Sequence, residues 1–295
     1  MTEFVNVSHD DIAQAWLHTT LEVAAAPEQK SFHSVTRIRD TAGDGEPRIH
    51  RAASDLLGEF DLQPLGTVAN TIFPAEMAAQ TPAIDALTAR YEAIYPQLRR
   101  LYRANLFGTY FHRLVAFPGP KGPENQLERV ITNLRGELSS RSPKRARYEM
   151  SLESPSDDAA IGGDVAGDAD GDASSGSTAG ATSVFAPGRD TRSMGFPCLS
   201  LLSFQQDRTH LHAVAHYRSQ HLLERGLGNY LGIARLMRYL AEQVGLQPGA
   251  LTIVAGQACA DHLRKSHILD LAALRSTLSN VAPTSATCDL KSDGR

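Results

Sequence analysis

Apolar residues recur at helical spacing in several stretches of the chain. The clearest stretch follows an acidic pair and ends just before Pro27, as expected for an amphipathic helix. Gly245 closes another such stretch, and Pro96 indicates a kink or break inside a third. Helices are predicted over residues 12–26, 49–60, 81–106, 125–138 and 229–244.

Shorter stretches rich in β-branched and aromatic residues indicate strands. Two of them flank the turn signal Gln206-Asp207-Arg208 and predict a hairpin, while Pro248-Gly249 indicates a turn. Residues 107–111 indicate an aromatic turn or strand. Strands or β-favouring segments are predicted over residues 34–38, 67–73, 148–152, 199–204, 209–218 and 251–255. The mixture predicts an α+β fold with a substantial sheet.

One long segment interrupts this pattern. Residues 153–190 consist mostly of Gly, Ala, Ser and Asp, and residues 153–188 carry seven acids and no Lys or Arg. Such a segment buries too little apolar surface to offset its ordering entropy, so a disordered acidic insertion is predicted. We expect a single domain over residues 1–280 and a flexible tail over residues 281–295; a linker between two domains is the alternative for the insertion.

Charge and cysteine content narrow the function classes. The net charge of −4 gives no indication of nucleic-acid or membrane binding, so neither partner is expected. The three cysteines are an odd number in a mid-sized chain, which favours a reducing, cytoplasmic compartment over a disulfide scaffold. The first residues lack the basic and apolar regions of a signal peptide, and no apolar stretch is long enough to span a bilayer.

Three polar side chains with complementary chemistry follow the acidic segment. Cys198 offers a nucleophilic thiol, and a cationic neighbour such as Arg218 would lower its pKa. The Arg218 guanidinium, followed by Ser219, can grip a phosphate, and the Asn229 amide can pair with a uracil edge. The simpler interpretations are a buried structural thiol for Cys198 and a helix N-cap for Asn229.

The order of these residues resembles the thymidylate synthase family, which includes the pyrimidine nucleotide hydroxymethylases. The family pattern is a Pro-Cys nucleophile, a strand ending in Arg-Ser, and a Gly-Leu-Pro-Phe-Asn-like turn that opens a helix. This chain has Pro197-Cys198, Arg218-Ser219 and Gly226-Leu227-Gly228-Asn229. The likeness covers residues 196–258 best and residues 101–152 more loosely.

The resemblance implies a thymidylate synthase-like fold, in which a large mixed sheet with flanking helices packs against its twin in a sheet-to-sheet homodimer. It also implies methyl or hydroxymethyl transfer to C5 of a uracil-type pyrimidine nucleotide after Cys198 adds to C6, with 5,10-methylenetetrahydrofolate as the donor. The nucleotide-binding residues expected from it are Arg218, Ser219, Asn229, Arg145 and Arg147. The last two would reach the phosphate bound by the partner subunit, and a solvated basic loop is their alternative.

Several positions differ from the family pattern. Where the family has Gly-Asp-x-His-x-Tyr to hold the sugar, this chain has Gly256-Gln257-Ala258-Cys259-Ala260-Asp261, and His221 replaces a folate-contacting Asp. Glu76 lies roughly where the family carries its catalytic Glu. Two alternatives follow: a catalytically inactive nucleotide-binding or structural member of the same fold, and altered chemistry on an unusual nucleotide.

Metal binding is the remaining candidate chemistry. Histidines 210, 212 and 216 share one face of a predicted strand, and Cys259, His262 and His267 have loose metal-like spacing. Interface and surface positions are the simpler interpretations of these side chains, so no metal site is predicted.

Overall fold

The computed structural model of the protein describes residues 4–101, 109–119, 122–141, 148–152 and 198–280. Its strands are β1 (Asn6–His9), β2 (Lys30–Ile38), β3 (Phe117–Gly119), β4 (Gly122–Glu124), β5 (Glu149–Ser151), β6 (Leu199–Gln206), β7 (His210–His221) and β8 (Gln247–Cys259). Its α-helices are α1 (Ile12–Ala25), α2 (Pro47–Glu59), α3 (Leu65–Ile72), α4 (Ala75–Gln80), α5 (Ile84–Leu101), α6 (Tyr110–Val115), α7 (Gln126–Leu138), α9 (Leu227–Val244) and α10 (Lys265–Ser279). A 3₁₀ turn (Pro27–Gln29) and a π-helical turn, η4 (Leu222–Gly226), complete the described elements.

A six-stranded mixed sheet organises the fold, in the order β1-β2-β8-β7-β6-β5. The pairs β1/β2 and β7/β8 are parallel, and the other neighbours are antiparallel. Strands β5 and β6 come from opposite sides of the acidic segment and pair with each other, so both sides contribute to one sheet. Strands β3 and β4 form a separate pair. The predicted mixture of helices with a large mixed sheet is confirmed.

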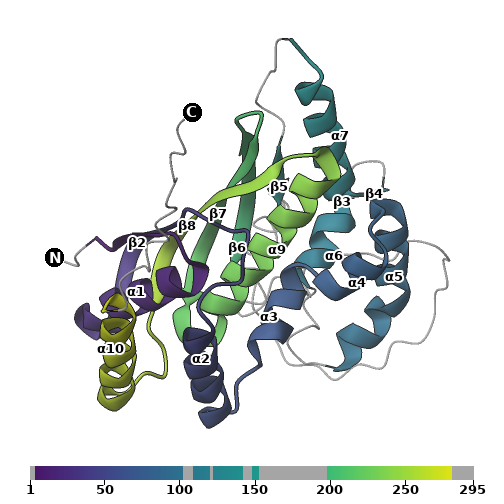
Figure 1. The fold of residues 1–295 in the computed structure, drawn as a ribbon. Coiled ribbons are helices and arrows are strands. Elements are labelled where there is room, and N and C mark those ends of the chain that lie inside the picture. Colours follow the sequence, from purple (N-terminus) through teal and green to yellow (C-terminus); the bar gives the residue numbers. More distant parts are fainter. Residues whose placement is uncertain (1–3, 102–108, 120–121, 142–147, 153–197, 281–295) are drawn as a thin grey trace, which may run out of the picture.

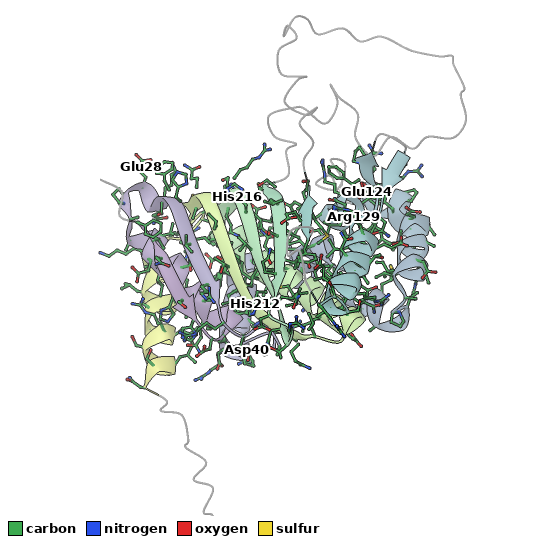
Figure 2. The ribbon with its side chains drawn as sticks, turned by 90° about the horizontal axis from the view of Figure 1, so that it is seen from above. Glu28, Asp40, Glu124, Arg129, His212 and His216 are labelled. Carbon is green, nitrogen blue, oxygen red and sulfur yellow. The ribbon has the colours of Figure 1, made fainter. Side chains whose placement is uncertain are left out.

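Helices cover one face of this sheet. In Figure 1, α1 and α9 lie across the strands, with α10 beside α1 and α3 beside α9. Along β7, alternate side chains such as Ala215 and Tyr217 are buried beneath these helices. Their neighbours point the other way: Val214 is 44% exposed, and His212 and His216, labelled in Figure 2, belong to the same open face. Alternation of this kind produces a sheet with one packed face and one open face.

Four neighbouring strands, β2, β8, β7 and β6, are irregular at one level, at positions that lie side by side in the sheet. His33 in β2 has a left-handed φ of 55°, and Ser200 is an extra residue in β6 where the β6/β7 register shifts. In β7 the alternation of buried positions skips from Tyr217 to Gln220, and β8 makes the same skip at this level. Irregularities of this kind increase the strand twist and change the direction of side chains. Beyond this level, the alternation of buried and exposed positions is therefore shifted by one residue.

Close contact between α3 and α9 corrects one expectation. The β-favouring segment 67–73 forms most of helix α3, with Val68, Ala69 and Ile72 buried at helical spacing. A Cβ on Gly232 would lie 2.8 Å from the Ala69 carbonyl oxygen, and one on Gly228 would lie 2.6 Å from the Val68 Cβ. The two glycines let the helices approach closely, and this packing outweighs the strand propensity of the segment.

Other segments also differ from the sequence-based expectation. Residues 110 and 111 begin helix α6, because the Thr109 side chain accepts a hydrogen bond from His112 N and caps it; residues 107 and 108 lie outside the described residues. Pro248-Gly249 is part of strand β8, where Pro248 aligns with Leu211 of β7. Helix α10 was missed because it buries only two side chains and so lacks a clear apolar stripe.

The remaining helix and hairpin predictions are confirmed within the described residues; residues 102–106 of the helix predicted over 81–106 lie outside them. Asp11 caps α1, Asn125 caps α7, and Gly245 closes α9 with a φ of 74°. Helix α5 continues through Pro96. The predicted insertion at 153–190 and tail at 281–295 lie outside the described residues. Among the helices that the structure describes, none combines the length and the apolar character needed to cross a membrane.

Candidate functional site

Strand pairing brings two of the predicted site residues together. Cys198 immediately precedes β6, and its carbonyl oxygen accepts a hydrogen bond of 2.8 Å from the Arg218 amide in β7. The next residues along, Leu199 and Tyr217, are a cross-strand pair with both side chains buried. The hairpin therefore fixes Cys198 and Arg218 opposite each other in adjacent strands.

The surroundings of the Cys198 thiol differ from those expected. The residue is half-buried, and burial raises the pKa of its thiol, while Arg225 lowers the pKa and Glu224 raises it. The cation that acts on the sulfur is therefore Arg225, of the π-helical turn η4, and not Arg218 as expected. Because burial outweighs Arg225, the thiol is protonated near neutral pH in this environment.

Three tyrosines lie on the packed side of Cys198: half-buried Tyr110 and fully buried Tyr217 and Tyr230. The Tyr110 hydroxyl accepts a hydrogen bond from Leu199 N at 3.5 Å, and burial raises the pKa of Tyr110 to about 12. Burial also raises the pKa of Tyr217 well above its usual value and that of Tyr230 to about 12. Among the described residues the Tyr217 hydroxyl has no hydrogen-bond partner. The Tyr217 hydroxyl is therefore a buried polar group near Cys198 whose hydrogen-bonding capacity is unused among the described residues.

Arg218 and Ser219 are half-buried near the end of β7. Gly256 of β8 lies against this point, because a Cβ there would come within 2.7 Å of the Arg218 carbonyl oxygen. Ser219 aligns with Gln257 in the parallel β7/β8 ladder. The other two predicted arginines, 145 and 147, lie outside the described residues.

Asn229 lies inside helix α9 and does not cap it. The helix begins at Leu227, and Gly226 is the residue before it, so Asn229 is the third helical residue. Its side chain is 4% exposed, and its amide makes no hydrogen bond to another residue in the part of the chain that the structure describes. Its position inside the helix is inconsistent with the N-cap interpretation.

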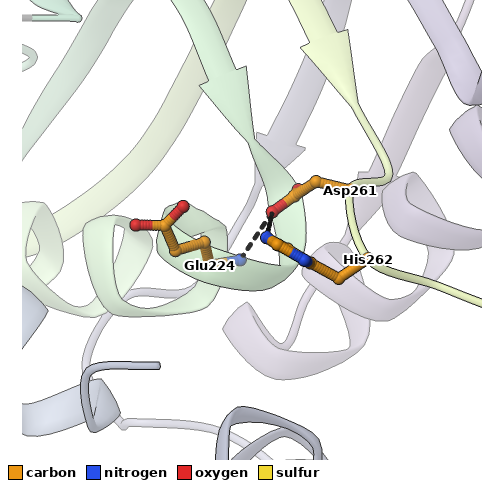
Figure 3. A group of neighbouring side chains, drawn as sticks. All are labelled: Glu224, Asp261 and His262. Atoms are coloured by element: carbon orange, nitrogen blue, oxygen red, sulfur yellow. Dashed lines mark hydrogen bonds and ion pairs between the residues drawn. The ribbon is translucent and has the colours of Figure 1, made fainter. Parts of the chain in front are cut away.

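The turn η4 is held from both sides and carries a group of ionisable side chains. The Trp16 indole donates to the Leu222 carbonyl at 2.7 Å. Asp261, just after β8, accepts from the amides of Leu223 at 3.3 Å and Glu224 at 3.4 Å. Figure 3 shows the Asp261 carboxylate beside the His262 ring and joined to the backbone amide of Glu224.

These three side chains, Glu224, Asp261 and His262, form the group with metal-ligand geometry among the described residues. Neither the β7 histidines nor the set of Cys259, His262 and His267 forms one there. Of these three residues, only His262 was a candidate metal ligand on the basis of the sequence. The signal that was missed is the charged pair Glu224-Arg225, which lies inside the gap-free interval between Arg218 and Asn229.

A cavity of about 320 Å³ lies beside the start of helix α6. Thr109 lines the cavity, and the adjacent Tyr110 reaches Leu199. Glu76, which the sequence placed near the catalytic Glu region of the resembled family, also lines it. The cavity lining among the described residues is Thr67, Asn70, Thr71, Pro74, Glu76, Met77, Tyr91, Ile94, Leu98 and Thr109.

Comparison with known proteins gives a short, partial likeness. No family model matches the chain. Over 86 residues the chain is 34% identical to a protein of Methanopyrus kandleri named "Putative thymidylate synthase". The matched stretch is 29% of this chain and spans about two fifths, 40%, of that relative. This match supports at most a thymidylate synthase-like relationship, and it rests on the name that the relative carries.

Proposed function

We propose that this protein binds a uracil-type pyrimidine nucleotide and transfers a one-carbon unit, methyl or hydroxymethyl, to C5 of its ring. The observation that supports the proposal is the backbone pairing of Cys198, the residue before β6, with Arg218 of β7. The short likeness to a protein named as a thymidylate synthase supports it independently. Cys259 and Asp261 stand where the resembled family has the residues that hold the sugar, so the proposal does not specify the sugar of the nucleotide.

Cys198 supplies the covalent step. Its thiolate attacks C6 of the ring, forming an S–C6 bond and moving the π electrons toward C5 and the C4 oxygen. C5 would then form a bond to the one-carbon unit as the bond between that unit and a nitrogen of the donor breaks. A hydroxymethyl product would require addition of water to the transferred carbon, and a methyl product would require a hydride from the reduced donor. Loss of the C5 proton and departure of the thiolate restore the C5–C6 double bond. Arg225 favours the thiolate at the start of this sequence, against the burial that disfavours it.

Nucleotide recognition is assigned to residues around the cysteine. Arg218 and Ser219 hold the phosphate, since a guanidinium offers a planar fork of donors to phosphate oxygens. Asn229 pairs with the base edge through its buried amide. We assign Arg145 and Arg147 to the phosphate bound by a second copy of the chain, in a homodimer formed through the open face of the sheet.

The donor proposed is 5,10-methylenetetrahydrofolate, which supplies the one-carbon unit when bound. The cavity lined by Thr109 suits a flat heteroaromatic ring, because polar Glu76 and Asn70 line it together with apolar Met77. In this assignment Glu76 and Asn70 orient the ring by hydrogen bonds, and the apolar residues exclude water.

The test is mass spectrometry of the intact protein after incubation with 5-fluoro-dUMP, with and without methylenetetrahydrofolate. Fluorine at C5 cannot leave as a proton does, so a covalent adduct on Cys198 is expected to accumulate. Release of tritium from C5-labelled dUMP measures turnover. Cys259→Ser is the matched control, since Cys259 is also half-buried and free. Absence of both adduct and tritium release would remove the catalytic proposal.

A catalytically inactive nucleotide-binding protein is the second candidate. The observation that favours it is the raised pKa of Cys198, which results from burial and is further raised by Glu224. Calorimetry distinguishes the two: dUMP binding that survives Cys198→Ser, without turnover in the unmodified chain, indicates a binding protein. A thermal-shift screen of other pyrimidine nucleotides tests the third alternative, an unusual substrate, because a ligand that binds only the folded state raises the melting temperature.

A further inference from the structure

Asp261 is a buried carboxylate without a strong cationic partner. Its side chain is 9% exposed, and no Lys or Arg forms an ion pair with it among the described residues. Its charged-group contacts are His262 Nε2 at 3.6 Å and His221 Nδ1 at 3.9 Å, both to Oδ2. Buried carboxylates of this kind are usually paired or coordinate a metal.

Glu224 approaches the same point from the π-helical turn. Two nitrogens of Arg225, Nε at 3.0 Å and Nη2 at 2.9 Å, contact Glu224, and both contacts are to Oε1. Oε2 therefore stands outside that ion pair. The hydrogen bonds that Asp261 accepts from the backbone of the turn fix the Glu224 main chain next to the Asp261 carboxylate.

His262 completes the group from the other side. It has a left-handed φ of 61°, and its ring lies against Phe60 with the ring centres 5.5 Å apart. One ligand atom from each of His262, Asp261 and Glu224 lies within 4.8 Å of the others (Figure 3). Donors around a tetrahedral ion at about 2.1 Å are about 3.4 Å apart, so small rotations of the exposed His262 and of Glu224 would close the set.

We infer that Glu224, Asp261 and His262 bind a divalent first-row transition metal ion. One imidazole with two carboxylates suits zinc, cobalt, nickel or iron better than calcium or magnesium, which prefer oxygen ligands alone. Three protein ligands leave at least one coordination position for water or a ligand. His221 positions Asp261 through its contact with the same oxygen. The inference rests on this cluster and does not depend on the proposed nucleotide chemistry.

Cobalt is the probe for the test, since its visible absorption reports the ligands. The full chain, stripped with a chelator, is titrated with Co²⁺ and followed by absorption and by equilibrium dialysis. We expect one ion per chain, with visible d–d bands and without the near-ultraviolet thiolate band that cysteine ligation would give. His262→Asn, Glu224→Gln and Asp261→Asn should each weaken binding by at least about tenfold.

The matched control is His33→Asn. His33 is another exposed histidine with a left-handed backbone, φ 55°, and Asn tolerates that conformation at both positions. His33→Asn should bind Co²⁺ as the unmodified chain does, and circular dichroism checks that each variant is folded. Failure of the unmodified chain to bind, a thiolate band, or equal affinity in the three ligand variants and the control would each overturn the inference. None of these readouts requires nucleotide binding or turnover.

Discussion

The Arg218 amide donates a hydrogen bond of 2.8 Å to the carbonyl oxygen of Cys198. The two residues are twenty positions apart in the chain, and the β6/β7 hairpin places them opposite each other. The register shift at Ser200 lies two residues from this pair. The pairing fixes the backbones of the two residues in adjacent strands, whereas the positive charge that acts on the Cys198 thiol comes from Arg225.

The first prediction concerns the guanidinium fork. Arg218→Lys keeps the positive charge but loses the planar pair of donors, so we expect dUMP binding to weaken by about 10- to 100-fold. Calorimetry measures the dissociation constant. Arg37→Lys, on the exposed side of β2, is the control and should leave the dissociation constant unchanged. Equal affinity in the two variants would contradict the assignment of Arg218 to the phosphate.

The second prediction concerns the thiol and follows from the direction of each effect on its pKa. Burial raises the pKa of Cys198, and Arg225 partly offsets this. Arg225→Gln should therefore raise the pKa further, so that alkylation by iodoacetamide at a fixed pH near 8 becomes slower and its pH profile moves to higher pH. The rate is followed by mass spectrometry of the Cys198 peptide.

Arg218→Gln serves as the comparison for this measurement. Burial first, then Arg225 and Glu224, account for the shift of the Cys198 pKa, whereas Arg218 was the cation expected from the sequence. We therefore expect the alkylation profile of Arg218→Gln to stay close to that of the unmodified chain. A larger shift in Arg218→Gln than in Arg225→Gln would restore the sequence-based expectation and refute the assignment of Arg225.

Much of the fold followed from local pattern. Helices such as α1 and α7 have caps and an apolar stripe, so their sequences specify them without knowledge of their neighbours. The hairpin of β6 and β7 was predictable from its turn residues. Helix α3 was not, because its strand-like residues become helical only when they pack against Gly228 and Gly232 of α9, far away in the chain.

The candidate site likewise combines features that the sequence predicts with features that depend on contacts between distant residues. Spacing identified Cys198, Arg218 and Asn229 as candidates, and two of them meet through strand pairing. Spacing could not reveal that Arg225 is the cation acting on the thiol, because the π-helical turn that carries it has no sequence signature of its own. Nor could spacing reveal that Asp261 contacts that turn, since Asp261 is separated by 38 positions from Leu223 and by 37 positions from Glu224.

The third prediction concerns the open face of the sheet. Leu201, Val214 and Phe32 are 36%, 44% and 50% exposed there, and the described helices cover only the opposite face. If this face forms the proposed homodimer, Val214→Asp would bury a charge at the interface and should weaken dimerisation by at least about tenfold. Sedimentation velocity across a concentration series measures the association.

Leu269→Asp is the control for this experiment. Leu269 is 60% exposed on helix α10, away from the open face, so the same loss of apolar surface and gain of charge should leave the association unchanged. A monomeric unmodified chain at every concentration would exclude the homodimer. Equal sensitivity of the two variants would show that the subunits meet elsewhere.

The fourth prediction tests the contact that positions α9 and, with it, Asn229. A Cβ on Gly232 would lie 2.8 Å from the Ala69 carbonyl oxygen and 2.9 Å from the Ile72 Cβ, and neither atom is the end of a flexible side chain. Gly232→Ala should therefore lower the free energy of unfolding by about 1 to 3 kcal/mol, because overpacking outweighs the better helix propensity of Ala. Urea denaturation followed by circular dichroism measures the change.

Gly136→Ala isolates the propensity effect. Gly136 also lies inside a helix, α7, but nothing lies within 4 Å of a Cβ built on it. Here Ala should raise the free energy of unfolding by up to about 1 kcal/mol. Opposite signs for the two substitutions are expected because only Gly232 touches backbone across a helix pair. A stabilising Gly232→Ala would mean that α3 and α9 are farther apart than the structure has them, and the burial of Asn229 would then lose its support.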